Sequence, residues 1–261
     1  MSIESRWRLD GARAVVTGGT RGIGLATVVE LLDLGASVVT AARDLDDLDP
    51  RLTAACDAGR LMLVGCDLAT ADGRSALLAA IPDTWEALDV LVNNVGTNVR
   101  QPSLAVIEAD YRRILDTNVT CAWDLARALH PRLAASGRGA IVNVGSVAGQ
   151  VSVGTGAVYA MSKAAIEHLT RYLAVEWAGD GIRVNAVAPW YIRTPLVEPV
   201  LGDPATLERV LAVTPMRRVG EPHEAAAVIA FLCLPAASFV TGQAIAADGG
   251  FLAYGFSPRP I

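Results

Sequence analysis

The chain has 261 residues, of which 52% are hydrophobic, and this is enough for one sizeable core. Its formal net charge is −5 with charges of both signs scattered along the chain, which argues against a nucleic-acid partner or an anionic membrane surface. The four cysteines form no C-x-x-C pair and have no histidine at metal-ligand spacing, so we expect reduced thiols and no metal site.

Short apolar runs alternate with segments of helical periodicity along most of the chain. The apolar runs predict strands at residues 13–17, 37–41, 61–65, 88–92, 139–144, 182–188 and 244–247. The periodic segments predict helices at residues 25–34, 44–58, 70–81, 104–130, 159–178 and 221–234. This alternation predicts an α/β fold, a Rossmann-type doubly wound parallel sheet of about seven strands with helices on both faces.

A glycine-rich turn with glycines at positions 18, 19, 22 and 24 joins the first strand to the first helix. Strand, turn and helix in this order form a phosphate cradle, because glycines let the backbone approach the ligand and the helix N-terminus offers free N–H groups. The spacing is Gly-x-x-x-Gly-x-Gly and no Gly-Lys-Ser/Thr follows, so it is neither the G-x-G-x-x-G fingerprint nor a P-loop. Its position in the chain still favours a dinucleotide site.

The end of the second strand indicates which dinucleotide binds. An acidic residue about 20 residues beyond the glycines often holds the ribose 2′-hydroxyl, but here the acid is absent and Arg43 is adjacent. Arg43 together with Arg21 of the glycine turn suits a 2′-phosphate, which prefers bidentate charge-assisted donors. Alternatively these arginines are solvated surface charges, and Asp44 or Asp46 supplies a carboxylate from a shifted register. We favour NADP(H) over NAD(H) on the charge argument.

Polar residues follow three further strands. Asp67 comes after the third strand, Asn93-Asn94-Val95-Gly96 ends the fourth, and Ser146 follows the fifth. Ligands of parallel sheets bind beyond the carboxyl ends of the strands. One cofactor is therefore expected to contact the glycine turn and the residues after the third and fourth strands together.

Tyr159 and Lys163 lie four residues apart in a run of good helix formers, so their side chains share one face of a helix about one turn apart. A tyrosine has a pKa of about 10, and an ammonium one turn away favours the phenolate and lowers that pKa. The pair is then able to move a proton to or from an alcohol or carbonyl oxygen. Alone, this spacing is more often a surface pair, and the other motifs favour proton transfer.

The segment at about 190–215 carries three prolines and a few apolar pairs. It predicts a loop with one or two short helices that covers the substrate. No linker or internal repeat argues for a second domain. We therefore expect residues 1–261 to form a single NADP-binding Rossmann domain.

Taken together, these motifs resemble those of the short-chain dehydrogenase/reductase family, from about residue 10 to the C-terminus. The likeness is carried by Thr17-Gly18-x-x-x-Gly22-x-Gly24, Asp67, Asn93-Asn94-x-Gly96, Asn118, Ser146, Tyr159-x-x-x-Lys163, Asn185 and Pro189. The stretch from Gly220 to Asp248-Gly-Gly looks most like tropinone reductases. Members of that group also pair two arginines for NADPH, which matches Arg21 and Arg43.

The resemblance implies roles for a catalytic group made of Asn118, Ser146, Tyr159 and Lys163. The serine would hydrogen-bond the substrate oxygen, and the tyrosine would be the acid in reduction and the base in oxidation. The lysine would lower the tyrosine pKa and bind the nicotinamide ribose. The asparagine would hold a water that links the lysine to solvent. The hydride would come from the cofactor.

The resemblance also implies a cofactor site formed by the glycine turn and the strand ends. Asp67 would meet the adenine, Asn94 and Gly96 the adenosine ribose side, and Ile192 and Thr194 the nicotinamide and its phosphates. The whole implied set is Gly18, Thr20, Arg21, Gly22, Ile23, Gly24, Arg43, Asp67, Leu68, Asn94, Gly96, Tyr159, Lys163, Pro189, Ile192 and Thr194.

The chain departs from the family after Pro189, where Trp190 replaces the usual glycine. The indole, with Tyr191 beside it, either shapes the substrate pocket or points into the core. The segment between residues 147 and 156 offers few polar anchors apart from Gln150 and Ser152. We therefore expect a small, fairly apolar or cyclic ketone, and the expected substrate residues are Ser146, Gln150, Tyr159, Trp190 and Tyr191.

The expected function is thus an NADP(H)-dependent oxidoreductase that interconverts a ketone and a secondary alcohol. One alternative is a nucleotide-binding sensor or scaffold, which would be expected to lose Tyr159, Lys163 or Ser146. Another is an isomerase or lyase of the wider superfamily. Fold likeness alone does not choose the substrate.

Several further expectations concern packing and assembly. The three histidines, His130, His168 and His223, have no evident Asp, Ser or Cys partner and are expected to be structural. Trp123 and Trp177 are expected to pack on helix faces. The apolar tail 251–261 and the long helices match tetramer contacts in the family, which implies a homotetramer or homodimer. With no signal peptide or membrane span, a cytoplasmic location is expected.

Overall fold

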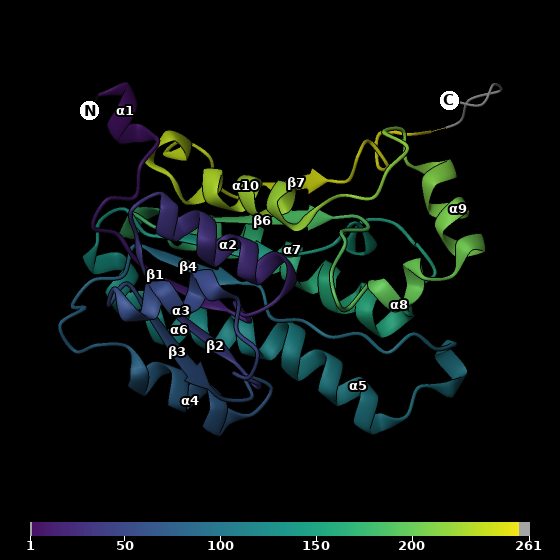
Figure 1. Ribbon diagram of the computed structural model, residues 1–261, viewed down its shortest axis with the longest axis horizontal. Helices are drawn as coiled ribbons and strands as arrows, with labels where there is room; N and C mark the ends of the chain where they lie inside the picture. Colours follow the sequence, from purple (N-terminus) through teal and green to yellow (C-terminus); the bar gives the residue numbers. More distant parts are fainter. Residues whose placement is uncertain (1, 256–261) are drawn as a thin grey trace.

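All seven strands lie in one parallel sheet, in the order β3-β2-β1-β4-β5-β6-β7 (Figure 1). The structure is a computed structural model that describes residues 2–255. The strands are β1 (Arg13–Thr17), β2 (Ser37–Ala42), β3 (Leu61–Gly65), β4 (Val90–Asn93), β5 (Ala140–Val144), β6 (Arg183–Pro189) and β7 (Ala244–Ala247). The predicted Rossmann-type parallel sheet is therefore confirmed.

The helices connect the strands and cover both faces of the sheet. They are α1 (Ile3–Arg6), α2 (Gly22–Asp33), α3 (Pro50–Asp57), α4 (Ala71–Ala80), α5 (Glu108–Leu115), α6 (Cys121–Ala135), α7 (Ala157–Glu176), α8 (Glu198–Leu201), α9 (Pro204–Val213) and α10 (Pro222–Cys233). Within residues 2–255, none of them is long and apolar enough to cross a membrane.

Two hydrophobic clusters flank the sheet. Helices α2 and α10 pack side by side over one cluster, which includes Leu31 and Ile229 (Figure 1). Helices α4, α6 and α7 cover the other cluster, which includes Leu77, Leu125 and Leu173. The inner strands are buried on both faces, whereas the edge strands β3 and β7 are partly exposed. Burial on both faces explains why the inner strands are nearly continuous apolar runs in the sequence.

The predicted helix at 44–58 is wrong in its first half, because α3 begins only at Pro50. Proline lacks the N–H group and suits the first turn of a helix. The Asp49 carboxylate caps this turn by accepting from the backbone N–H of Arg51 at 2.9 Å. Asp47 has a φ of 50°, in the left-handed region, which a right-handed helix does not allow.

The predicted helix at 104–130 is wrong in detail, because four elements share its length. A single 3-10 turn, η1 (Ser103–Ala105), precedes α5, and a π-helical turn, η2 (Asp116–Thr120), separates α5 from α6. Helix α6 then continues to Ala135. A π turn adds a residue to the helical repeat and shifts the phase of the side chains around it. Asn118 lies in this turn.

The carboxyl ends of the parallel strands meet at one edge of the sheet, towards which the arrow of β7 points in Figure 1. Helices α8 and α9 project beyond this edge (Figure 1). They lie within the segment 190–215, so the predicted loop with one or two short helices is confirmed as local structure. We call residues 190–215 the cover segment.

Candidate active site

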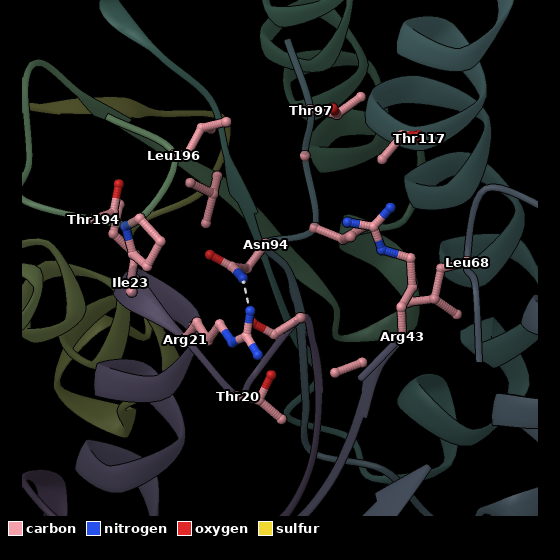
Figure 2. A pocket seen from close by; sticks show the side chains of 18 of the residues that line it. Thr20, Arg21, Ile23, Arg43, Leu68, Asn94, Thr97, Thr117, Thr194 and Leu196 are labelled. Atoms are coloured by element: carbon pink, nitrogen blue, oxygen red, sulfur yellow. Dashed lines mark hydrogen bonds between the residues drawn. The ribbon is translucent and has the colours of Figure 1, made fainter. Parts of the chain in front are cut away.

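A cavity of about 520 Å³ lies at the carboxyl edge of the sheet (Figure 2). Its wall contains residues from the ends of six strands, β1 to β6. Since the strand order is 3-2-1-4-5-6, the residues after β2 and β3 lie at one end of the cavity, and those after β5 and β6 lie at the other. Such a cleft at the switch point of the strand order is where open α/β sheets bind ligands.

The glycine turn brings the start of α2 against the cavity. Gly22 has a φ of 58°, a left-handed conformation that favours glycine, and a Cβ at Gly24 would lie 2.1 Å from the Gly18 carbonyl oxygen. Arg21 is the N-cap residue, but it makes no side-chain capping bond. The first N–H groups of α2 therefore lack a side-chain cap at the cavity wall, which is the arrangement that binds phosphate groups.

Asn94 links the end of β4 to the glycine turn. Its amide Nδ2 donates to the Thr17 carbonyl at 2.8 Å and to the Gly18 carbonyl at 3.1 Å. The Thr17 hydroxyl accepts from the backbone N–H groups of Asn94 and Val95 at 2.9 and 3.0 Å. Asn94 lines the cavity, and these bonds also give it a structural role in fixing the shape of the turn.

The two arginines predicted for a 2′-phosphate both line the cavity, but their surroundings differ. Arg21 forms an ion pair with Asp44, with Nη2 and Oδ2 at 2.7 Å. Within residues 2–255, the Arg43 guanidinium has no hydrogen bond or ion pair, and its side chain extends into the cavity (Figure 2). The carboxylate of Asp44 is thus already engaged, while Arg43 keeps five donors available for an anion.

Asp67 and Leu68 line the same end of the cavity, directly after β3. Asp67 Oδ1 accepts from the backbone N–H of Ala69 at 3.0 Å, and Leu68 is buried. Together they offer one polar and one apolar contact beside the arginines.

Ser146 and Tyr159 meet at the other end of the cavity. Ser146 follows β5, and its Oγ accepts from the backbone N–H of Ala148 at 3.1 Å, which fixes the hydroxyl at the start of a 3-10 turn. Tyr159 lies in the first turn of α7 and lines the same wall, close enough for the Ser146 hydroxyl to lower the pKa of its phenol. The predicted serine–tyrosine pair is therefore assembled on one side of the cavity.

The pKa of Tyr159 differs from the prediction. Burial is the largest influence and raises this pKa, because it disfavours the phenolate. The hydrogen bond from Ser146 and the charge of Arg100 act in the opposite direction. The expectation that Lys163 lowers the tyrosine pKa is thus not met, because Lys163 is not among the groups that shift it.

Lys163 lies one turn after Tyr159 and is only 4% exposed. Its Nζ is 5.7 Å from the centre of the tyrosine ring and donates to the Val144 carbonyl at 2.8 Å. Burial lowers the pKa of this ammonium to about 8. Lys163 is also the only lysine in the chain.

Asn118 supports the catalytic end but does not line the cavity. Its Oδ1 accepts from the Thr97 N–H at 2.8 Å, and its Nδ2 donates to the Thr97 carbonyl at 3.0 Å and to Ser162 Oγ at 2.9 Å. These bonds connect the segment after β4 with helix α7 next to Lys163. The π turn is what directs the buried amide into this position.

The expected substrate residues divide into two groups. Ser146, Tyr159 and Trp190 line the cavity, and Trp190 is half-buried. Gln150 and Tyr191 do not line it. Gln150 Nε2 instead donates to Glu167 Oε1 at 3.0 Å, outside the cavity. The structure therefore does not support a substrate contact for Gln150 or Tyr191.

Some cavity residues were not expected from the sequence. The largest of them is Arg113 of α5, an exposed arginine without an ion pair within residues 2–255, one turn before Thr117, which also lines the wall. The sequence could have placed Arg113 at the cavity only through its helical spacing from Asn118. The π turn changes that spacing.

Two expectations outside the cavity are also wrong. His130 has an acidic partner after all, since its Nε2 lies 3.0 Å from Asp180 Oδ2. Trp177 packs in the core as expected, but Trp123 is exposed and lies under Arg127, with the guanidinium 5.2 Å from the ring centre. For the apolar tail, residues 256–261 lie outside the described part of the chain.

Comparisons with known proteins agree with this geometry. A profile of the family described as Enoyl-(Acyl carrier protein) reductase matches residues 18–252. A tropinone reductase homologue from Arabidopsis thaliana is 46% identical over 260 residues, and the match covers 98% of this chain and 98% of that protein. A tropinone reductase homologue from Datura stramonium is 41% identical, with 97% of this chain and 96% of that protein covered.

Solved structures show the same fold. One is a gluconate 5-dehydrogenase from Burkholderia cenocepacia in complex with NADP and tartrate, with a TM-score of 0.88, 32% identity, and coverage of 97% of this chain and 100% of that one. Another is a short-chain type dehydrogenase/reductase from Mycobacterium marinum, with a TM-score of 0.88, 33% identity and the same coverage.

Proposed function

Because the chain belongs to the short-chain dehydrogenase/reductase family of oxidoreductases, we propose that it interconverts a ketone and a secondary alcohol with NADP(H). The observation that carries this proposal is that Ser146, Tyr159 and Lys163 line the same cavity as an uncapped helix N-terminus, with Lys163 one turn after Tyr159. One end of the cavity thus suits a nucleotide and the other suits proton transfer to an oxygen.

The proton steps follow from the tyrosine. Because burial raises the pKa of Tyr159, the phenol keeps its proton at neutral pH and acts as the acid in ketone reduction. It gives this proton to the carbonyl oxygen while Ser146 donates a hydrogen bond to the same oxygen. In alcohol oxidation the phenolate takes the proton back, so this direction is favoured by high pH.

The residues present fit a dinucleotide. The first residues of α2 line the cavity and no side chain caps their N–H groups, which suits a phosphate, and the Arg43 guanidinium is available for a 2′-phosphate. Asp67 and Leu68 would flank the adenine, and Lys163 would meet the nicotinamide ribose. When bound, the cofactor supplies or accepts the hydride.

The preference for NADP(H) over NAD(H) rests on Arg43. The acidic residue nearest the end of β2 is Asp44, and its carboxylate is paired with Arg21 at 2.7 Å. Within residues 2–255, Arg43 has no ion pair, so its guanidinium is available to an anion at this end of the cavity. A related gluconate 5-dehydrogenase binds NADP in its solved structure, which supports the same choice.

For the substrate we propose a small, fairly apolar or cyclic ketone. Trp190 lines the catalytic end of the cavity, and Leu196 and Val197 of the cover segment lie in the same wall. These side chains favour hydrocarbon over charge. The cover segment, by this proposal, shields the bound ketone from water.

A second substrate class is a ketone that carries a carboxylate. Arg100 acts electrostatically on Tyr159, so a positive charge lies near the catalytic hydroxyl. Relatives of known structure include gluconate dehydrogenases. Keto acids therefore belong in the same screen as neutral cyclic ketones.

The assembly proposed is a homotetramer or homodimer. Helix α7 exposes Met161, Tyr172 and Val175, and α6 exposes Trp123, so both helices offer apolar surface to another copy. A cytoplasmic location stays a prediction, and one relative from Arabidopsis thaliana is named as chloroplastic.

The proposed function is tested by mixing the purified protein with NADPH or NADH and a panel of neutral ketones, keto acids and the matching alcohols. Loss of the absorbance of the reduced nicotinamide, dependent on a ketone and faster with NADPH, is the expected result. A protein that binds NADPH but turns over none of the panel would favour the sensor alternative.

A further inference from the structure

Trp190 connects three segments that are far apart in the sequence. Its indole is stacked on the Phe251 ring, with 3.9 Å between ring centres and an angle of 6° between the planes. Its Nε1 donates to Thr214 Oγ1 at 3.0 Å. Its backbone N–H donates to the Ala247 carbonyl at 3.2 Å. Trp190, which follows β6, is thus held by Thr214 at the end of the cover segment, by Ala247 at the end of β7 and by Phe251 after β7.

The groups that hold the indole are themselves fixed. Thr214 is 1% exposed, and its hydroxyl donates to the Val210 carbonyl at 2.7 Å. The backbone N–H of Met216 donates to the Gly249 carbonyl at 3.1 Å. A Cβ at Gly249 would lie 2.9 Å from Thr214 Cγ2, so the segment after β7 packs tightly against the end of the cover segment.

Trp190 is one of the residues that line the cavity of the catalytic group, and its side chain is half-buried. Trp190 lines the same wall as Ser146 and Tyr159, whereas Phe251 and Thr214 do not reach it. Tyr191 packs edge-on against the indole, with ring centres 4.6 Å apart and planes at 79°. Two ring contacts and one hydrogen bond hold the indole, so it can move only by breaking them.

We propose that Thr214 and Phe251 are positioning residues that hold Trp190 as a fixed wall and thereby set the size of ketone that the site accepts. This inference rests on the proposed ketone reduction. It assigns a role in specificity to two residues that touch neither the substrate nor the catalytic group. The indole is hydrogen-bonded at its edge and stacked on one face, so it cannot rotate away. It therefore excludes bulky ketones by its shape.

The test compares variants that release the indole with variants that keep its contacts. Thr214→Val removes the acceptor of the indole N–H, and Thr214→Ser keeps it. Phe251→Leu removes the stacked ring, and Phe251→Tyr keeps it. Phe239→Leu is the control for the same substitution on a fully exposed side chain.

The readout is the ratio of kcat/KM for a bulky cyclic ketone to kcat/KM for a small ketone. Thr214→Val and Phe251→Leu should raise this ratio by about fivefold or more, since pocket shape discriminates by roughly tenfold for each methylene. The NADPH dissociation constant should stay unchanged. Thr214→Ser, Phe251→Tyr and Phe239→Leu should keep the wild-type ratio. An equal change for all ketones would overturn the inference, because it would mean a general loss of stability.

A second measurement does not depend on catalysis. The chain has five tryptophans, so their indole N–H signals are resolved by NMR, and the Trp190 signal is identified by its loss in Trp190→Phe. The Trp190 N–H should exchange slowly with solvent and quickly in Thr214→Val. Fast exchange in the wild type, like that of the exposed Trp7, would contradict the fixed wall. If no ketone is reduced but the Trp190 N–H exchanges slowly, the proposed function is wrong and the fixed position of the indole is still supported.

Discussion

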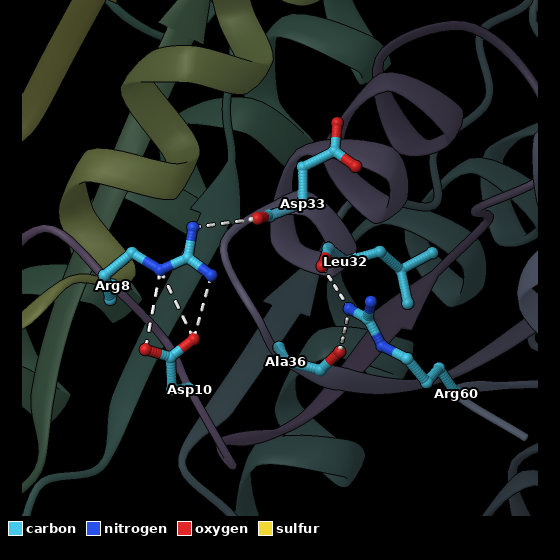
Figure 3. A network of polar contacts seen from close by, with 6 residues as sticks. All are labelled: Arg8, Asp10, Leu32, Asp33, Ala36 and Arg60. Carbon is cyan, nitrogen blue, oxygen red and sulfur yellow. Dashed lines mark hydrogen bonds and ion pairs between the residues drawn. The ribbon is translucent and has the colours of Figure 1, made fainter. Parts of the chain in front are cut away.

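The two ends of helix α2 differ in how their backbone groups are satisfied. At the C-terminal end, Arg60 donates to the carbonyls of Leu32 and Ala36, and Arg8 donates to the Asp33 carbonyl at 3.2 Å (Figure 3). At the N-terminal end, no side chain caps the helix, and its first residues line the cavity. Every helix leaves N–H groups free at its start, so the open end is the one that suits an anionic ligand.

The same contrast extends to the two edges of the sheet. At the amino edge, Asp89 accepts from the Arg13 backbone N–H at 2.9 Å and from Arg138 Nε at 2.7 Å. At the carboxyl edge, within residues 2–255, Arg43 has no partner and the buried Lys163 has no carboxylate. The closed edge stabilises the fold, whereas the open edge keeps charges and donors that a ligand would satisfy. The substitutions below should separate the stabilising role of the closed edge from the ligand-binding role of the open edge.

The largest effect is expected from Tyr159→Phe at the open edge. Loss of the proton donor should reduce turnover by about 10²–10⁴-fold, because this is the usual contribution of general acid catalysis. NADPH should bind as tightly as before. Tyr172→Phe is the matched control, since this exposed tyrosine lies on the same helix away from the cavity. Steady-state rates with the best ketone of the panel decide the comparison.

Lys163→Met should remove turnover and at the same time stabilise the fold. The folded protein holds the Lys163 pKa at about 8, below its ordinary value of 10.5, so the unfolded chain binds this proton more tightly. The charge therefore costs the folded state about 3 kcal/mol near pH 7, and this cost declines as the pH rises from about 8 to about 10.5. Urea denaturation should find the variant more stable near pH 7, with a smaller gain near pH 9.5. If the variant is less stable than the wild type at both pH values, the charge of Lys163 does not destabilise the folded state.

Arg43→Ala should weaken NADPH binding by about 10-fold to 100-fold, because a hydrogen bond to a charged group contributes about 1.5–3 kcal/mol. NADH binding should change little. Arg51→Ala is the control, since this exposed arginine is paired with Asp49 outside the cavity. Dissociation constants from the fluorescence of the reduced cofactors give the answer. Equal losses for both cofactors would remove the 2′-phosphate assignment.

The smallest effect is expected from Arg60→Met at the closed end of α2. Two carbonyls lose their donor, which should lower the free energy of unfolding by about 1–3 kcal/mol. NADPH binding and turnover should not change. Arg8→Met should cost under about 1 kcal/mol, because Arg8 and its partner Asp10 are exposed. A change in NADPH affinity in either variant would mean that the two ends of α2 are coupled.

The sequence predicted the sheet well because the inner strands are apolar runs, and most of them end at or just before Gly, Asn or Pro. The family resemblance was recognisable because several of its motifs follow the ends of strands. The match to the family confirmed it. The helices were harder. Pro50 moved the start of α3, and the π turn at Asn118 divided a segment whose periodicity looked continuous.

The substrate end was predicted only in part. Gln150 is four residues from Ser146, but the 3-10 turn between them directs its side chain to Glu167. Trp190 and Ile192 line the cavity whereas Tyr191 does not, because side chains alternate along an extended chain. The contacts of Trp190 with Thr214 and Phe251 join distant segments, which no local pattern in one sequence indicates.

The central claim is that this cavity transfers a hydride between a nicotinamide and a carbonyl carbon. The most direct measurement uses NADPH with deuterium in place of both hydrogens at C4 of the nicotinamide ring and a cyclic ketone from the panel, with the product alcohol analysed by mass spectrometry. The account predicts that the wild-type protein forms an alcohol with deuterium at its carbinol carbon. No alcohol, or an alcohol without the label, would contradict it.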